Sequence, residues 1–369
     1  KVNYWTGSQT KDFEKEFAKY IKNEYAIALS NGSIALELAY KSIKQNDPRF
    51  EIITTPRTFI ATSSSAVLQG LKPVFADVDL ETGMITVDTI EPLINKNTLG
   101  ISVVHLGGFP ADMINICNLA NKYNLKVIED CSQAHGAKIE ENGIWKSVGS
   151  FGDIGTWSFC QDKIMTTGGE GGMVSMNDMN YWDLIWSYKD HGKNYNLISH
   201  GNTSNEFKWL HDNLGSNYRL TEFQSAIGRI QLTKLDKWIN LRTRNASILN
   251  EKLKNLDLIR LPKLSQNFKN SWYKYYIYLN KECLKSEWNR SRIIKEINNL
   301  NLPAFSGSCS EIYLEKCFKN IGITPKQRLK NAKILGETSL MFLVHHTITE
   351  DQMNFYADKI YQICKLATK

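Results

Sequence analysis

The sequence predicts an α/β fold in which a mostly parallel central sheet carries helices on both faces, with a smaller α+β domain at the C-terminal end. Three observations support this. Short apolar runs recur as far as Phe159, amphipathic stretches separate several of them, and the pattern changes after Gly192. Alternating strands and helices are typical of a parallel sheet covered by its crossover helices. A chain of 369 residues is long enough to form two domains.

The first part of the chain begins with a predicted amphipathic helix at 12–23, whose apolar side chains recur with helical spacing. We expect a strand at 25–29, after which Ser30, Asn31, Gly32 and Ser33 open a second helix. Further strands are expected at 52–54, 73–77, 101–105, 125–129 and 154–159, and a further helix at 112–123.

After Gly192 the predicted elements are longer and fewer. Residues 195–215 have the composition of a polar loop, and a helical pattern then runs over 221–253. A β-prone run follows at 272–279, with helices near 292–300 and 351–366. We therefore expect a large domain at 1–220, and a connecting helix with a small α+β domain at 221–369.

Composition narrows the class of protein. The hydrophobic fraction of 42% and the charged fraction of 22% are ordinary for a globular chain, and no apolar run reaches membrane-spanning length. The net charge of +7 either favours anionic substrates such as nucleotides or reflects lysines that solvate the surface. The sequence has no basic block of the kind that binds nucleic acid. Seven dispersed cysteines, without zinc spacing, indicate reduced thiols in the cytoplasm and no metal site.

A single lysine stands at the end of one predicted strand. Lys163 follows the apolar run 154–159 and precedes a glycine-rich segment at 168–172. Because glycines have no side chain, a flat ligand can lie close to the backbone beside the lysine. A lysine that forms a Schiff base with a carbonyl compound needs this placement, and the pattern favours pyridoxal 5′-phosphate (PLP). The other possibility is a solvated surface lysine.

A second strand ends in an acid. Asp130 follows the apolar run 125–129, where it is either a helix cap or the carboxylate that keeps the pyridine nitrogen of PLP protonated. Gln133, three residues on, can reach the phenolic oxygen of the cofactor or cap a helix start. With Lys163, Asp130 would be the catalytic pair.

Other residues complete the predicted cofactor site. Gly32 and Ser33 offer backbone N–H groups at a helix start, and Ser158 adds a hydroxyl, so that together they could bind the phosphate. Phe59, after a strand, could stack on the cofactor ring, although core packing is the ordinary role of a phenylalanine. His191 lies where the first domain ends and is either a surface histidine or a substrate contact.

Five blocks together resemble the DegT/DnrJ/EryC1/StrS family, the PLP-dependent nucleotide-sugar aminotransferases of fold type I, the aspartate aminotransferase fold. The blocks are ALSNGSIAL at 28–36, TFIAT at 58–62 with PVFADVD at 73–79, VIEDCSQAHGA at 127–137, the lysine block at 155–172 and GSNYRLTE at 215–222. The resemblance covers nearly the whole chain. It implies the roles given above, and it adds Asn217 as a phosphate ligand donated across a homodimer interface and Arg219 at the edge of the site.

The resemblance also implies a reaction. Glutamate would load the cofactor as pyridoxamine 5′-phosphate, and the amine would then pass to a nucleotide-linked keto sugar, preferably a 4-keto-6-deoxyhexose, for bacterial surface polysaccharide such as O-antigen. The alternatives are a dehydratase-like family member, in which histidine replaces the lysine, and a regulatory protein that binds PLP without turnover. Two segments depart from the family pattern. Gly107 replaces a tyrosine, and the neighbourhood of Gly307 lacks a His-Pro stretch. Both are expected to border the sugar.

Overall fold

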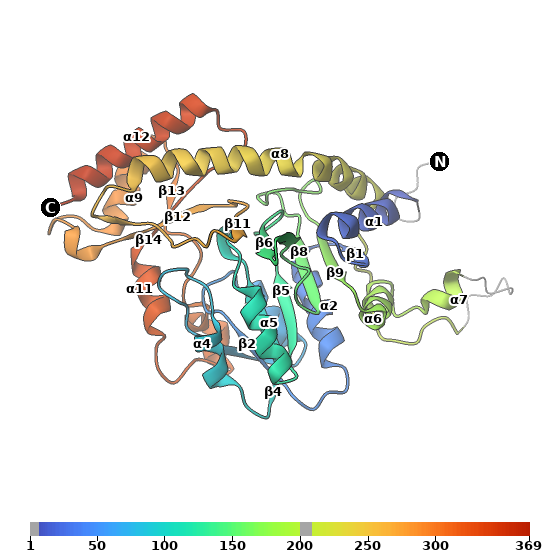
Figure 1. Cartoon of the computed structure of the whole chain (residues 1–369). Helices are drawn as coiled ribbons and strands as arrows, with labels where there is room; N and C mark the ends of the chain where they lie inside the picture. Colours follow the sequence, from blue (N-terminus) through green and yellow to red (C-terminus); the bar gives the residue numbers. More distant parts are fainter. Residues whose placement is uncertain (1–6, 200–208) are drawn as a thin grey trace.

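The computed structural model describes residues 7–199 and 209–369, and its centre is a seven-stranded sheet with the order β1-β9-β8-β5-β4-β2-β3 (Figure 1). The strands are Tyr25–Leu29 (β1), Glu51–Thr54 (β2), Lys72–Phe75 (β3), Thr98–Val104 (β4), Lys126–Asp130 (β5), Ile154–Ser158 (β8) and Gly172–Met176 (β9). The pairs from β3 to β8 are parallel, whereas β9 is antiparallel to both β8 and β1. The mostly parallel sheet is confirmed, and β9 is an additional strand.

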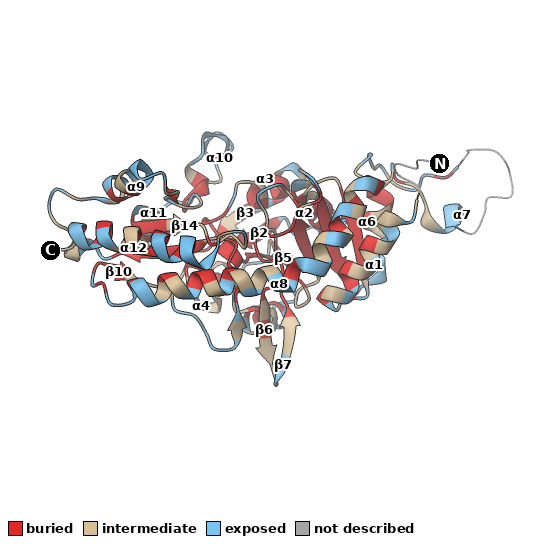
Figure 2. Cartoon of the chain, turned by 90° about the horizontal axis from the view of Figure 1, so that it is seen from above, coloured by how far each residue is buried: buried red, intermediate tan, exposed pale blue. Residues whose placement is uncertain are grey.

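Helices cover both faces of this sheet. Ile52 and Ile128 belong to an apolar cluster with helices α2 and α6, whereas their neighbours Ile53 and Val127 belong to a second cluster with α1 and α5. Successive side chains of a strand point to opposite faces, so the two clusters lie on opposite sides of the sheet. Figure 2 shows the buried strands between the helices. The helices of this part are Gln9–Ile21 (α1), Gly32–Lys44 (α2), Ala61–Leu68 (α3), Val87–Ile90 (α4), Met113–Lys122 (α5), Met179–Lys189 (α6) and Tyr195–Ser199 (α7).

The segment expected to be a polar loop at 195–215 begins with helix α7, so this prediction was wrong for its first turn. The ring of Tyr195 packs against the rings of Trp182 and Trp186, with centroids 4.8 Å away in each case. Asn194 accepts a hydrogen bond from the backbone N–H of Leu197 at 3.1 Å. Aromatic packing and a cap thus outweigh the polar composition. Residues 200–208 of the expected loop lie outside the described residues.

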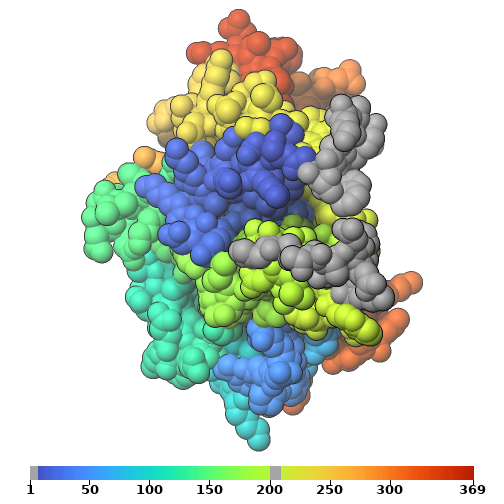
Figure 3. Space-filling view, turned by 90° about the vertical axis from the view of Figure 1, so that its right-hand side faces the viewer, coloured from blue at the N-terminus to red at the C-terminus, as the bar shows by residue number. Residues whose placement is uncertain are grey.

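A long helix connects the two ends of the molecule. Helix α8, Glu222–Leu253, packs against α1 near its start and against α12, Glu350–Ala367, near its end (Figure 1). In Figure 3 the blue atoms of α1 lie between the yellow atoms of α8 and the yellow-green atoms of α6. Thr221 and Gln224 form a capping box that begins α8 at the predicted position.

The C-terminal part adds an antiparallel sheet of order β10-β12-β14-β13, and a third sheet has the order β11-β6-β7. Their strands are Ile259–Arg260 (β10), Tyr275–Leu279 (β12), Ala304–Phe305 (β13), Ser339–Phe342 (β14), Lys138–Glu141 (β6), Ile144–Ser147 (β7) and Phe268–Lys269 (β11). The remaining helices are Arg290–Asn299 (α9), Lys316–Asn320 (α10) and Lys330–Thr338 (α11). The division at 220/221 stays a prediction. No helix within 7–199 or 209–369 is long and apolar enough to cross a membrane.

Candidate active site

A cavity of about 1090 Å³ opens where strands β5 and β8 end and α2 begins. One part of its wall is formed by the large sheet. The other part comes from the C-terminal region, with Tyr273, Lys274, Tyr276 and residues near 305 and 341. Seven predicted site residues line it: Gly32, Ser33, Phe59, Asp130, Gln133, Ser158 and Lys163. Fold topology therefore brings together side chains that are more than 100 positions apart in the sequence.

Asp130 is a buried carboxylate that ends β5. Its Oδ2 accepts a hydrogen bond from the hydroxyl of Thr62 at 2.8 Å, and its Oδ1 accepts one from the backbone N–H of Ser132 at 3.1 Å. Both donors are uncharged, and no ion pair involves Asp130 among the described residues. A buried carboxylate with only neutral donors favours a cationic ligand. Gln133 accepts a hydrogen bond from Gly107 N–H at 2.8 Å, which fixes it in the wall.

Lys163 lies just beyond β8, with 16% of its side chain exposed. Its Nζ lies 3.6 Å from Oδ1 of Asp162 and 5.0 Å from the ring centroid of Tyr273. Tyr273 in turn donates a hydrogen bond to Asp162. Burial raises the pKa of Asp162, but this hydrogen bond and the charges of Lys163 and Lys274 outweigh it and bring the pKa below its ordinary value. An ionised carboxylate therefore lies beside the lysine amine.

The start of α2, which also lines the cavity, suits an anion. Asn31 caps α2 by accepting a hydrogen bond from Ile34 N–H at 3.0 Å. Gly32 packs so tightly against β8 that a Cβ atom there would lie 2.5 Å from Cβ of Ser158. The positive end of a 13-residue helix therefore meets a hydroxyl at close range. Phe59 also lines the cavity and is 66% exposed, so its ring is accessible to a ligand.

Three predicted residues do not line this cavity in the part of the chain described. Asn217 is exposed and pairs through its backbone with Asp190, whose side chain accepts a hydrogen bond from Arg219. His191 is exposed, with φ at 60°, and its backbone N–H donates to the carbonyl oxygen of Ser216 at 3.0 Å. The roles assigned to these three side chains stay predictions.

Part of the cavity wall was not predicted from the sequence. Tyr273, Lys274 and Tyr276 line the cavity but lie in a segment that was expected only to form a strand. The two departures from the family pattern meet here. A Cβ at Gly107 would lie 3.0 Å from the ring of Tyr276, and one at Gly307 would lie 2.4 Å from it. The absence of side chains at both glycines thus makes room for the ring of Tyr276. The sequence signal that could have indicated this wall is Lys274, the one charged residue in an aromatic run.

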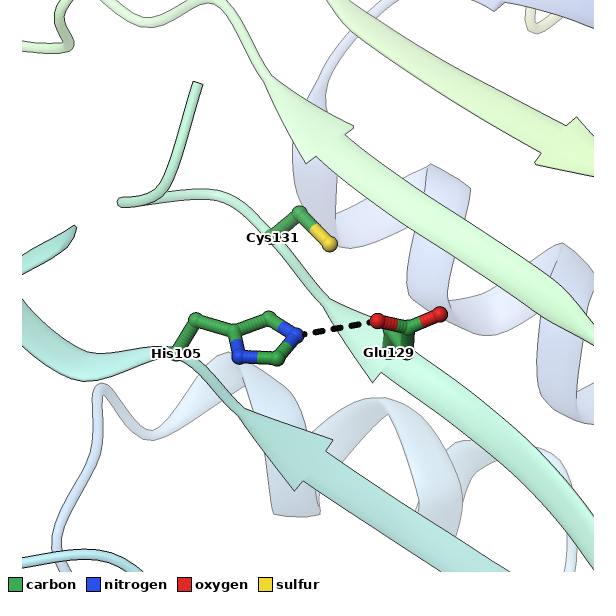
Figure 4. A group of neighbouring side chains, drawn as sticks. All are labelled: His105, Glu129 and Cys131. Carbon is green, nitrogen blue, oxygen red and sulfur yellow. Dashed lines mark hydrogen bonds and ion pairs between the residues drawn. The ribbon is translucent and has the colours of Figure 1, made fainter. Parts of the chain in front are cut away.

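A buried group behind the cavity has metal-like spacing: His105, Glu129 and Cys131 (Figure 4). Nδ1 of His105 accepts a hydrogen bond from Ala111 N–H at 3.1 Å, so its Nε2 carries the proton and donates to Glu129 at 3.1 Å. The same carboxylate also accepts three backbone N–H groups, from Gly149, Phe151 and Gly152. Burial raises the pKa of the Cys131 thiol, with the charges of Glu129 and Asp130 adding to it. Protein donors and a protonated thiol leave little for a metal ion to bind.

The donor set of the cavity fits PLP. A lysine amine, a buried carboxylate for the ring nitrogen, an anion cradle for the phosphate and an exposed aromatic ring are the groups that such a site requires. Fold and site together define a PLP-dependent aminotransferase.

Comparisons with known proteins identify the family. The model of the DegT/DnrJ/EryC1/StrS aminotransferase family matches residues 2–360, and the chain belongs to this family. The solved structure of an aminotransferase from Psychrobacter cryohalolentis is similar, with 47% identity, a TM-score of 0.94, and 99% of this chain and 93% of that chain covered.

Curated relatives include sugar aminotransferases. GDP-perosamine synthase from Escherichia coli O157:H7 is 38% identical over 68% of this chain and 64% of its own length. UDP-N-acetyl-3-dehydro-alpha-D-glucosamine 3-aminotransferase from Acidithiobacillus ferrooxidans is 36% identical over 76% of this chain and 72% of its own length.

Proposed function

We propose that this enzyme transfers an amino group from glutamate to a nucleotide-linked keto sugar, preferably a 4-keto-6-deoxyhexose, for a bacterial surface polysaccharide such as O-antigen. The observation that carries the proposal is a single cavity of about 1090 Å³ that both Lys163 and Asp130 line. The names of the two curated relatives support a nucleotide sugar as the substrate class. The expected location is the cytoplasm.

Lys163 would be the central catalytic residue. PLP, when bound, supplies an electron sink for the pair of electrons left at the substrate carbon after proton loss. Lys163 would hold the cofactor covalently and, once displaced by the substrate amine, move a proton to and from that carbon. Asp162, at 3.6 Å, then stabilises the ammonium ion that forms.

The remaining residues would hold the cofactor. Asp130 would keep the ring nitrogen protonated, because a buried carboxylate with uncharged donors gains most from a cation. Gln133 would donate to the phenolic oxygen and Phe59 would cover one face of the ring. Gly32, Ser33 and Ser158, at the start of α2 and the end of β8, would bind the phosphate.

The active unit would be a homodimer. Phe223, Ile227 and Ile230 form an exposed apolar stripe on the first turns of α8, and their spacing places them on one side of the helix. A second copy on this surface would bury the stripe and bring its Asn217 towards the phosphate, with Arg219 and His191 near the sugar entrance. This arrangement accounts for the exposure of Asn217 in a single chain.

Two measurements test the proposal. Borohydride reduction of the PLP-loaded enzyme followed by peptide mapping should place the label on Lys163, and Lys163→Ala should lose both label and turnover. Lys269→Ala is the matched control, because this lysine also lies over an aromatic ring, Trp145 at 3.8 Å, outside the cavity.

The second measurement is turnover. Glutamate should bleach the visible band of the lysine-bound cofactor and release 2-oxoglutarate, and a panel of 4-keto and 3-keto nucleotide sugars should then restore the band. A label elsewhere would overturn the assignment of Lys163. No response to any keto sugar, after glutamate has reduced the band, would overturn the proposed acceptor.

A further inference from the structure

A second lysine lies in the cavity beside Lys163 and has no role in the scheme above. Lys274 precedes β12, and its ammonium group lies 4.7 Å from the centroid of the Tyr273 ring. The Nζ atom of Lys163 lies 5.0 Å from the centroid of the same ring. Both amines therefore lie close to one phenol ring, within the same cavity.

The backbone that presents Lys274 is held firmly. Arg242 of α8 is 1% exposed, and its Nη1 donates hydrogen bonds to the carbonyl oxygens of Trp272 at 3.1 Å and Tyr273 at 3.3 Å. Trp272 has φ at 54°, which a tryptophan adopts only where its surroundings enforce it. The N–H of Lys274 also donates to the carbonyl oxygen of Gly107 at 3.3 Å. The position of Lys274 is thus built into the packing between α8 and the cavity wall.

Around Tyr273 the cavity wall carries two lysines and one carboxylate. Lys163, Lys274 and Asp162 line the cavity, and Arg242, which does not line it, lies buried against the backbone of residues 272 and 273. Asp162 pairs with Lys163 and accepts the hydroxyl of Tyr273, whereas the ion pairs of the described residues include none with Lys274. Burial lowers the pKa of Lys274, and the charges of Arg242 and Lys163 lower it further against the opposing effect of Asp162. An anionic ligand would relieve this imbalance.

We propose that Lys274 binds a carboxylate group of the amino donor. The identity of the donor as glutamate rests on the proposed function. In an amino acid the carboxylates lie within a few bonds of the reacting nitrogen, so a cation beside the same tyrosine ring as Lys163 suits them. In a nucleotide-linked 4-keto hexose the diphosphate is separated from the keto carbon by the width of the sugar ring. The neighbouring position of Lys274 therefore favours the donor carboxylate over the diphosphate.

The test is the half-reaction with L-glutamate alone. The glutamate concentration that converts half of the lysine-bound cofactor should rise about 20-fold in Lys274→Gln, because a charge-assisted hydrogen bond is lost. Lys274→Arg should stay within about threefold, and the matched control Lys269→Gln should not change. Each variant is first shown to take up PLP and to be labelled at Lys163, which separates a binding defect from misfolding.

Binding of UDP and GDP to the PLP-loaded variants distinguishes the two sources of anion. Equal nucleotide affinity in wild type and Lys274→Gln, with weakened glutamate, supports the inference. Weakened nucleotide with unchanged glutamate, or an equal loss for both, overturns it. Should wild type not respond to glutamate, the proposed donor fails. The same titration with L-glutamine, L-aspartate and L-alanine then finds the donor, and Lys274→Gln must weaken that donor for the inference to stand.

Discussion

Among single residues, His135 shows how a buried polar group constrains the pH range of the enzyme. Its ring packs against Trp157 and Phe159, with centroids 5.4 and 5.6 Å away, and both ring nitrogens are buried. Burial, with the nearby charge of Lys163, lowers the pKa of His135 to about 3. The folded protein therefore keeps this imidazole neutral at every pH at which it is expected to work.

The predicted consequence is loss of stability in acid. An unfolded histidine has a pKa of about 6.5, so below that pH the unfolded chain binds a proton that the folded chain does not. The free energy of unfolding should therefore fall as the pH drops from about 6.5 towards 3, by about 1.4 kcal/mol per pH unit from this residue. The free energy of unfolding, measured with urea at pH 7.5, 6.0 and 5.0, should depend less steeply on pH in His135→Phe than in the wild type. The difference in slope should correspond to the uptake of one proton. Parallel slopes for the two proteins would contradict the assignment.

At the scale of elements, the start of α2 combines stability with cofactor binding. Asn31 caps the helix through its side chain, and the same helix end faces Ser158 in the proposed phosphate cradle. Asn31→Ala should lower the free energy of unfolding by about 1 kcal/mol, because the cap is lost. Asn31→Asp should retain the cap and the stability of the cofactor-free protein, because aspartate is an equally good cap.

The two substitutions should differ in cofactor binding. Asn31→Asp places a negative charge beside the phosphate, so its affinity for PLP should fall about tenfold although the helix stays capped. Thermal unfolding of the cofactor-free protein and titration with PLP separate the two effects. Unchanged affinity in Asn31→Asp would show that the phosphate lies elsewhere.

Local patterns predicted the elements and residues that depend on neighbours in sequence. The strand at 25–29 was predicted with the bounds observed for β1, because an apolar run lies between polar residues and a helix cap. Strand β9 was missed because the glycines before it resemble the end of a loop. The short strands β6, β7 and β11 carry little apolar periodicity, so they depend on pairing with each other.

The same distinction applies to the cavity. The strand ends that carry Asp130 and Lys163 are contiguous motifs that could be recognised in the sequence, and both residues line one cavity. The wall formed by Tyr273, Lys274 and Tyr276 depends on the contact of 271–276 with Gly107 and Gly108, more than 150 positions away. No local pattern encodes that contact. Only the unusual glycines at 107 and 307 indicated that the wall differs from the family pattern.

At the scale of the whole molecule, the proposed dimer divides the active site between two chains. Lys163 lines the cavity of its own chain, whereas Asn217 is exposed on the surface beside it. If Asn217 acts across the interface, a chain that lacks Lys163 and a chain that lacks Asn217 can restore one complete site between them. This complementation is possible only in a dimer with shared sites.

The prediction concerns dimers that combine Lys163→Ala with Asn217→Ala, purified through two different affinity tags. The Lys163→Ala homodimer should be inactive, and the Asn217→Ala homodimer should lose about 10- to 100-fold in activity at limiting PLP, because a hydrogen bond to the phosphate is missing. The mixed dimer should recover about half of the wild-type activity, since one of its sites has both residues intact. Activity no higher than that of one Asn217→Ala site would place Asn217 in the cavity of its own chain, and failure to isolate a mixed species would argue against the dimer itself.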